Sequence, residues 1–196
     1  MVDSTKQIST SRIEGLSDVR WEPLYDTYKI ATGSATAFTN RFFSTQIGGT
    51  KTEKDTNMQL AASLPKPHIF RCFGIKFECI TYHKTDIMLL PKLMETAYLR
   101  FFIGTKDYLT VPMAKASGGI TMHVAGGKTD GADEIHFEQS GTSSSDGYKF
   151  PKNGYIDIGN SENFGVELVS ASTHGNAAAD MYIRCYLLGY RALEVR

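Results

Sequence analysis

The sequence predicts an all-β fold, an antiparallel β-sandwich with one or two short helical inserts, and three observations lead to this prediction. The chain of 196 residues contains 11 Phe and 10 Tyr, and aromatic side chains favour strands and packed sheet faces. It also contains 18 Gly, which supply turns between short strands. About eight apolar segments of strand length follow one another with turn-forming residues between them, which is typical of sandwiches and jelly rolls. No internal repeat or linker divides them, so we expect one domain over residues 21–196.

Residues 1–20 precede this domain and are expected to form an arm or extended segment without a core of its own. They are rich in Ser, Thr and charged residues, and their apolar residues are scattered. Two alternatives stay open at this point, a disordered arm and an arm that becomes ordered against a neighbouring subunit.

The first elements of the domain are expected between residues 21 and 65. A first strand is expected within 21–30, with Pro23 near its start or on a sheet edge. A stretch of small residues, 31–37, then leads into residues 38–43, which include three phenylalanines. Residues 55–65 predict a short helix, because Asp55 or Thr56 can cap its N-terminus and Pro65 can end it.

The clearest strand signal covers residues 69–82, where apolar and polar residues alternate with a period of two. Lys76 and Glu78 are predicted on one face of this strand. The opposite, buried face is predicted to hold Phe73, Ile75, Phe77, Cys79 and Thr81.

The second half of the chain continues this pattern. Residues 86–97 have helical spacing interrupted by Pro91, which predicts a helix that begins near the proline or a turn before it. Residues 125–147 are rich in Gly, Ser and acidic residues and predict a long exposed loop with one short strand at 134–138. In the last strand, Gly189 is expected at a bulge or bend. The remaining strands are expected at 98–103, 108–111, 120–124, 155–158, 164–169 and 181–195.

Charge and cysteine content exclude several classes of protein. The 21 Lys and Arg equal the 21 Asp and Glu, so the formal net charge is zero, and we expect no sequence-specific binding to nucleic acid. The three cysteines, Cys72, Cys79 and Cys185, lie in apolar segments and are expected to be buried free thiols, not disulfides or zinc ligands. The N-terminus lacks the apolar core of a signal peptide, and no apolar stretch is long enough to span a bilayer. We therefore expect a soluble chain made in the cytoplasm.

A search for chemistry identifies no catalytic, cofactor-binding or metal-binding residues, so we expect neither a cofactor nor an enzyme. None of the five histidines falls in HxH, HxxxH or HExxH spacing. Asp130, Asp133 and Glu134 could gather a calcium ion, but an acidic exposed loop is the commoner explanation for them. Five aromatic residues near the start of the domain have two interpretations: Trp21, Tyr25, Tyr28, Phe42 and Phe43. They could form an exposed platform on which sugars stack, but more often such residues fill a sheet core or a subunit interface.

Two stretches of the chain resemble jelly-roll capsid proteins of small tailless bacterial viruses. One is residues 56–65 with the following strand segment 70–77, and the other is the closing run 181–191, which ends with Gly and Arg. The resemblance implies a single jelly roll with two facing four-stranded sheets, which assembles into capsomers of an icosahedral shell. It supplies no catalytic residues.

The expected function is therefore that of a virion structural protein, made in the host cytoplasm, whose partners are copies of itself and other virion proteins. The neutral N-terminal segment also suits a shell that encloses a lipid membrane. The alternative function is a carbohydrate- or receptor-binding β-sandwich, such as a virion spike or fibre head. A third alternative is a β-barrel enzyme with dispersed catalytic residues.

Overall fold

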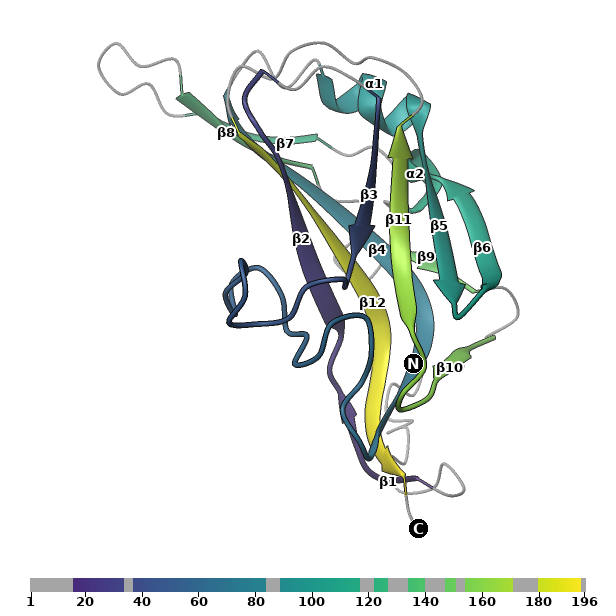
Figure 1. Cartoon of the computed structure of the whole chain (residues 1–196). Coiled ribbons are helices and arrows are strands. Elements are labelled where there is room, and N and C mark those ends of the chain that lie inside the picture. The colour runs from purple at the N-terminus through teal and green to yellow at the C-terminus, as the bar shows by residue number, and fades with distance from the viewer. Residues whose placement is uncertain are drawn as a thin grey trace, which may run out of the picture.

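The chain folds into two antiparallel β-sheets that face each other across a core, so the predicted all-β sandwich is confirmed (Figure 1). The computed structural model describes residues 16–33, 37–83, 89–116, 122–126, 134–139, 147–150, 154–170 and 180–194. In chain order, the elements within these residues are β1 Leu16–Trp21, β2 Leu24–Ile30, β3 Phe38–Phe42, β4 His68–His83, α1 Leu89–Thr96, β5 Ala97–Ile103, β6 Lys106–Pro112, α2 Met113–Ala116, β7 Met122–Gly126, β8 Glu134–Gln139, β9 Tyr148–Lys149, β10 Ile156–Ile158, β11 Phe164–Ser170 and β12 Met181–Glu194.

The large sheet has the order β1-β12-β4-β8-β7, in which β2 also pairs with β12, and β9 and β10 pair with β4. The small sheet has the order β3-β11-β5-β6. The two longest strands, β4 and β12, therefore lie side by side at the centre of the large sheet and have partners on both sides (Figure 1).

The strand pairs are nested along the chain. Strand β2 pairs with β12, β3 with β11, β4 with β8, β9 and β10, and β5 with β6. The successive pairs alternate between the large and the small sheet. The chain from β2 to β12 thus follows the path of one long antiparallel hairpin that is folded across the sandwich, with β5 and β6 at its tip.

Alternation along β12 explains why this strand lies between the core and an outer face. Met181, Ile183, Cys185 and Leu187 are buried, and the residues between them are half-buried on the opposite face. A period of two places successive side chains on opposite sides of a strand, so apolar residues at every second position favour a sheet with one covered face.

Strand β4 departs from the predicted pattern at Phe73. Ile75, Phe77 and Cys79 are buried as predicted, but Phe73 is half-buried and contacts aromatic rings of the outer face. Cys72, its neighbour in the chain, is fully buried in its place. The prediction that Phe73 belongs to the buried face is therefore wrong, and the side chain of Thr81, predicted on the same face, lies outside the described residues.

A β-bulge causes this reversal. The ladder between β4 and β12 passes from Leu188 opposite Gly74 to Gly189 opposite Cys72, so Phe73 has no opposite residue. One extra residue in a strand shifts its side-chain alternation by one position. The predicted bulge or bend at Gly189 is confirmed.

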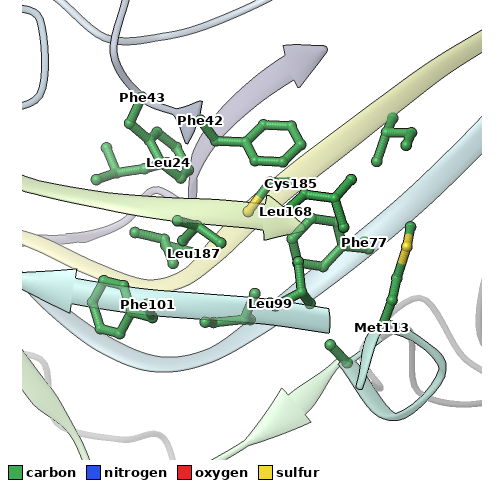
Figure 2. Close-up of a cluster of buried hydrophobic side chains, with 14 of the residues drawn as sticks. Leu24, Phe42, Phe43, Phe77, Leu99, Phe101, Met113, Leu168, Cys185 and Leu187 are labelled. Atoms are coloured by element: carbon green, nitrogen blue, oxygen red, sulfur yellow. The ribbon is translucent and has the colours of Figure 1, made fainter. Parts of the chain in front are cut away.

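The core between the sheets is filled by aromatic and aliphatic side chains from both sheets (Figure 2). Phe42 of the small sheet packs edge-on against Phe77 of the large sheet, with ring centroids 5.6 Å apart and an interplanar angle of 73°. Each such ring stabilises the fold by about 2 to 3 kcal/mol through burial. The labelled core residues are Leu24, Phe42, Phe43, Phe77, Leu99, Phe101, Met113, Leu168, Cys185 and Leu187.

The helix predicted over residues 55–65 does not form. The segment between β3 and β4 consists of turns and isolated bridges, one of which joins Thr56 to Asp26 of β2. The N–H of Tyr25 donates a hydrogen bond to Oδ1 of Asn57 over 2.9 Å. Side chains and backbone groups of the segment are thus paired with β2, and this tertiary pairing outweighs the local helical preference.

Two short helices lie near one end of the small sheet (Figure 1). Helix α1 begins at Leu89, so the predicted helix near Pro91 is confirmed. The proline lies in the first turn, where its missing N–H leaves no intrahelical bond unmade. Leu93 and Met94 of α1 are buried in the core. No helix of the described ranges has the length and apolar character to cross a membrane.

The first predicted strand is divided into β1 and β2, with Glu22 and Pro23 between them. Strand β1 pairs with β12 and begins at Leu16, inside the segment that was expected to be an arm or extended. Residues 1–15 of that segment lie outside the described residues. Most of the predicted loop at 125–147 also lies outside them, but its predicted strand corresponds to β8.

Candidate binding and assembly surfaces

The outer face of the large sheet contains a groove of about 530 Å³. We call it the outer-face groove. Its residues come from β1, the β1–β2 connection, β4, β9 and β12. They are Trp21, Pro23, Phe73, Gly74, Lys76, Glu78, Lys149, Tyr186 and Leu188. Its volume lies within the range of small-molecule binding sites, about 300 to 1,000 Å³.

Four aromatic rings form a continuous row beside the outer-face groove. Trp21 packs edge-on against Tyr190 at 5.1 Å, Tyr190 against Phe73 at 5.5 Å, and Phe73 against Tyr155 at 6.2 Å between ring centroids. The two ends of this aromatic row are exposed, Trp21 by 57% and Tyr155 by 52%. The bulge in β4 completes the row, because it turns Phe73 outward.

Charged groups at the groove are held in fixed positions. Nζ of Lys76 donates to Oε1 of Glu78 over 2.7 Å, and the hydroxyl of Tyr186 donates to Oε2 over 2.8 Å. Burial raises the pKa of Tyr186, so its hydroxyl keeps its proton near neutral pH. The carboxylate of Glu78 therefore has a defined orientation on the sheet.

Arg71 extends the aromatic row with a cation. Its guanidinium lies 4.0 Å from the ring centroid of Tyr155 and donates two hydrogen bonds, of 2.7 and 2.8 Å, to the carboxylate of Asp157. Arginine stacked on an exposed tyrosine is typical of protein contact surfaces.

The outer face of the small sheet combines arginines with aromatic rings as well. Arg41 lies over the ring of Phe102 at 4.6 Å from its centroid, and Arg100 forms an ion pair with Glu167. Tyr98 on the same face is exposed. A second surface that combines arginines with aromatic rings thus lies on the side of the sandwich opposite the aromatic row.

A smaller polar pocket of about 160 Å³ lies where β1 meets the ends of β4 and β12, and it includes His68 and Arg191. Nη1 of Arg191 donates to Glu22 over 2.9 Å. Burial first and the charge of Arg191 second lower the pKa of His68. His68 is therefore neutral near physiological pH. The pocket is a small polar contact region between β1, β4 and β12.

The structure separates the aromatic residues that the sequence grouped together. Phe42 and Phe43 are fully buried in the core, and Tyr28 packs against Phe38, with ring centroids 5.7 Å apart. Trp21 and Tyr25 lie on the outer face of the large sheet.

Other candidate residues are placed in part. The three cysteines are buried free thiols, as predicted. The calcium candidates Asp130 and Asp133 lie outside the described residues, and so does the side chain of Glu134. Among the side chains that the structure describes, no group of three or more His, Cys, Asp or Glu could hold a metal ion.

Several residues of the aromatic row and the groove were not identified from the sequence. Tyr186 and Tyr190 carry a signal that could have found them, because they occupy outward positions between the buried residues of β12. Tyr155 and Phe73 carry no comparable signal, since their meeting depends on the strand register and the bulge.

A comparison with family models, curated proteins and solved structures gives no match for this chain.

Proposed function

We propose that this chain is a virion structural protein, a single jelly roll that assembles with copies of itself into capsomers of an icosahedral shell. The main observation in support is that both outer faces of the sandwich present exposed aromatic residues next to arginines. Tyr155 with Arg71 lies on one face, and Tyr98 with Arg100 on the other. Tyrosine, tryptophan and arginine are enriched in protein interfaces.

Contact surfaces on opposite faces favour an assembly in which each subunit touches two neighbours. Such heterologous contacts generate rings or closed shells when the rotation between subunits closes. The zero net charge agrees with this, because a neutral protein repels its own copies weakly, and it gives no support to binding of a genome through phosphates.

The nested strand pairing supports the jelly-roll part of the proposal. Eight-stranded jelly rolls consist of two packed antiparallel sheets with Greek-key connections. Here the pairs β2–β12, β3–β11, β4–β8 and β5–β6 supply four strands to each sheet in the order expected of a rolled hairpin. The two stretches that resemble jelly-roll capsid proteins cover residues 181–191 of β12 and 70–77 of β4, the central pair of the large sheet.

The test is the particle size of the purified full chain, measured by light scattering and negative-stain electron microscopy across salt concentration and pH. We expect pentamers, hexamers or closed shells. A stable monomer or a lone trimer under every condition would overturn the proposal.

Variants locate the contacts. Tyr155→Glu on the large sheet and Tyr98→Glu on the small sheet place a charge on an exposed ring position and are expected to reduce particle size. Thr50→Glu, on the exposed β3–β4 segment, is the matched control and is expected to assemble normally. Circular dichroism checks that all three variants keep their fold.

A further inference from the structure

We propose that the outer-face groove binds a pyranose ring of a neutral glycan, with its aromatic residues against the ring and Glu78 as an acceptor for ring hydroxyls. This inference concerns a binding activity and does not depend on the assembly proposal.

The residues of the groove suit the two kinds of surface on a sugar. A pyranose has apolar C–H faces and a rim of hydroxyl groups, so its site needs aromatic surface together with a few placed polar groups. Trp21, Phe73 and Tyr186 supply the aromatic surface, and Pro23 and Leu188 add aliphatic contacts. The volume of about 530 Å³ accommodates a small saccharide.

Glu78 has capacity for hydroxyl groups. A carboxylate offers about four acceptor positions. Lys76 Nζ and the Tyr186 hydroxyl occupy one position on each oxygen. Because these two donors hold the carboxylate in place, the remaining acceptor positions are preorganised, which lowers the entropic cost of binding.

The ion pairs in and beside the groove suit a ligand without charge, and Lys149 is a further charged residue of the lining. Lys76 and Glu78 form an ion pair, so their charges compensate each other. Arg71, near the same face, is likewise paired with Asp157. A ligand that carries hydroxyl groups can bind these groups without introducing an uncompensated charge.

The position of the groove argues against an extended peptide as the occupant. Strands β4 and β12 both have antiparallel partners on each side, so their backbone N–H and C=O groups belong to ladders already (Figure 1). A peptide that adds a strand requires an open sheet edge. Recognition in the groove must therefore come from side chains, and the site is fixed on the two central strands.

The chain contains a built-in reporter of occupancy. It has one tryptophan, Trp21, and this residue lines the groove while being 57% exposed. Titration of the full chain with D-glucose, D-galactose and N-acetyl-D-glucosamine, followed by tryptophan fluorescence, is expected to give a saturable blue shift with at least one sugar. The shift arises because the sugar excludes water from the indole.

Leu188→Phe is the principal variant, because a larger side chain at this half-buried outer position fills the groove. It is expected to abolish the saturable shift while leaving the thermal unfolding temperature unchanged. Leu60→Phe, at an exposed leucine outside the groove, is the matched control and is expected to bind as the unchanged chain does.

Glu78→Gln tests the role of Glu78 as the acceptor. It is expected to weaken sugar binding by about tenfold, because a hydrogen bond to a charged group is lost. Glu53→Gln, at an exposed position outside the groove, serves as its control. The assembly variant Tyr155→Glu is expected to keep sugar binding, which separates this proposal from the assembly proposal. The absence of any sugar-dependent shift, or an equal shift in Leu188→Phe, would overturn the sugar proposal.

Discussion

The ammonium group of Lys51 lies 2.8 Å from each carboxylate oxygen of Asp26, whose side chain has no exposed surface. The backbone N–H of Phe43 donates a third hydrogen bond to Asp26, over 2.6 Å. Asp26 belongs to β2, Phe43 follows β3, and Lys51 belongs to the segment between β3 and β4. One buried carboxylate thus joins the two sheets and the segment that replaced the predicted helix.

The first prediction concerns this ion pair. Lys51→Met removes the cation and leaves a buried carboxylate with neutral partners, which is expected to lower the free energy of unfolding by about 3 kcal/mol. Urea unfolding of the unassembled chain measures the loss. Lys66→Met, at an exposed lysine of the same segment, is expected to change stability by less than about 0.5 kcal/mol. Equal unfolding midpoints for the two variants would contradict the prediction.

The second prediction concerns the pH dependence of Asp26. Burial raises its pKa above the ordinary value of 3.8, although Lys51 and the Phe43 N–H act in the opposite direction. The folded chain therefore binds a proton at pH values where the unfolded chain has lost it. The contribution of this proton to the free energy of unfolding is present below the unfolded pKa and is lost as pH rises through the folded pKa. The stability of the unchanged chain relative to Asp26→Asn is expected to increase as pH falls from neutral towards 3.8.

Asp180 provides a control of opposite sign. Lys29 first, and the N–H and hydroxyl of Thr32 next, lower the pKa of Asp180. The contribution of the Asp180 carboxylate to the free energy of unfolding is present above the unfolded pKa and is lost as pH falls through the folded pKa. The stability of the unchanged chain relative to Asp180→Asn is thus expected to decrease on acidification. Urea unfolding across this pH range compares both variants, and slopes of the same sign would contradict the assignment.

The strands that the sequence predicted well are those with one buried face. In β12, alternating residues such as Ile183 and Cys185 point into the core, and the period of two is visible without knowledge of the partner strands. The segment 55–65 was mispredicted because its pairing depends on residues such as Tyr25, which lie far away in the sequence. Local propensity carries no information on such tertiary bonds.

The outer-face groove could not be predicted for a related reason. Trp21, Phe73 and Tyr186 come from three distant parts of the chain, and the pairing of β1, β4 and β12 brings them together. The outward position of Phe73 depends in addition on the bulge, and a one-residue shift reverses the face of every side chain beyond it. Composition indicated abundant aromatic residues but not which of them stay exposed.

The third prediction concerns the thiols. Burial raises the pKa of Cys72 and of Cys79 to about 12, and that of Cys185 well above its ordinary value. Since the thiolate is the reactive form, the folded chain is expected not to react with Ellman's reagent at mildly alkaline pH. In denaturant, all 3 Cys are expected to react. A thiol that reacts in the folded chain as fast as in denaturant would show that its strand is not buried.

The fourth prediction concerns the bulge that forms the aromatic row. A Cβ on Gly189 would clash with the carbonyl oxygen of Arg71 and would lie 2.7 Å from Cζ of Phe70. Because Arg71 belongs to the central strand β4, its carbonyl cannot move without disturbing the ladder. Gly189→Ala is therefore expected to destabilise the fold by about 3 kcal/mol.

Gly49→Ala is the matched control for this substitution. A Cβ on Gly49 would have its nearest contact at 3.5 Å, an ordinary van der Waals distance, and no positive φ is involved. Its stability in urea is expected to change by less than about 0.5 kcal/mol. If Gly189→Ala were as stable as Gly49→Ala, the close approach of β12 to β4 at the bulge would be wrong. The outward position of Phe73, and with it the continuity of the aromatic row, would then lose its structural basis.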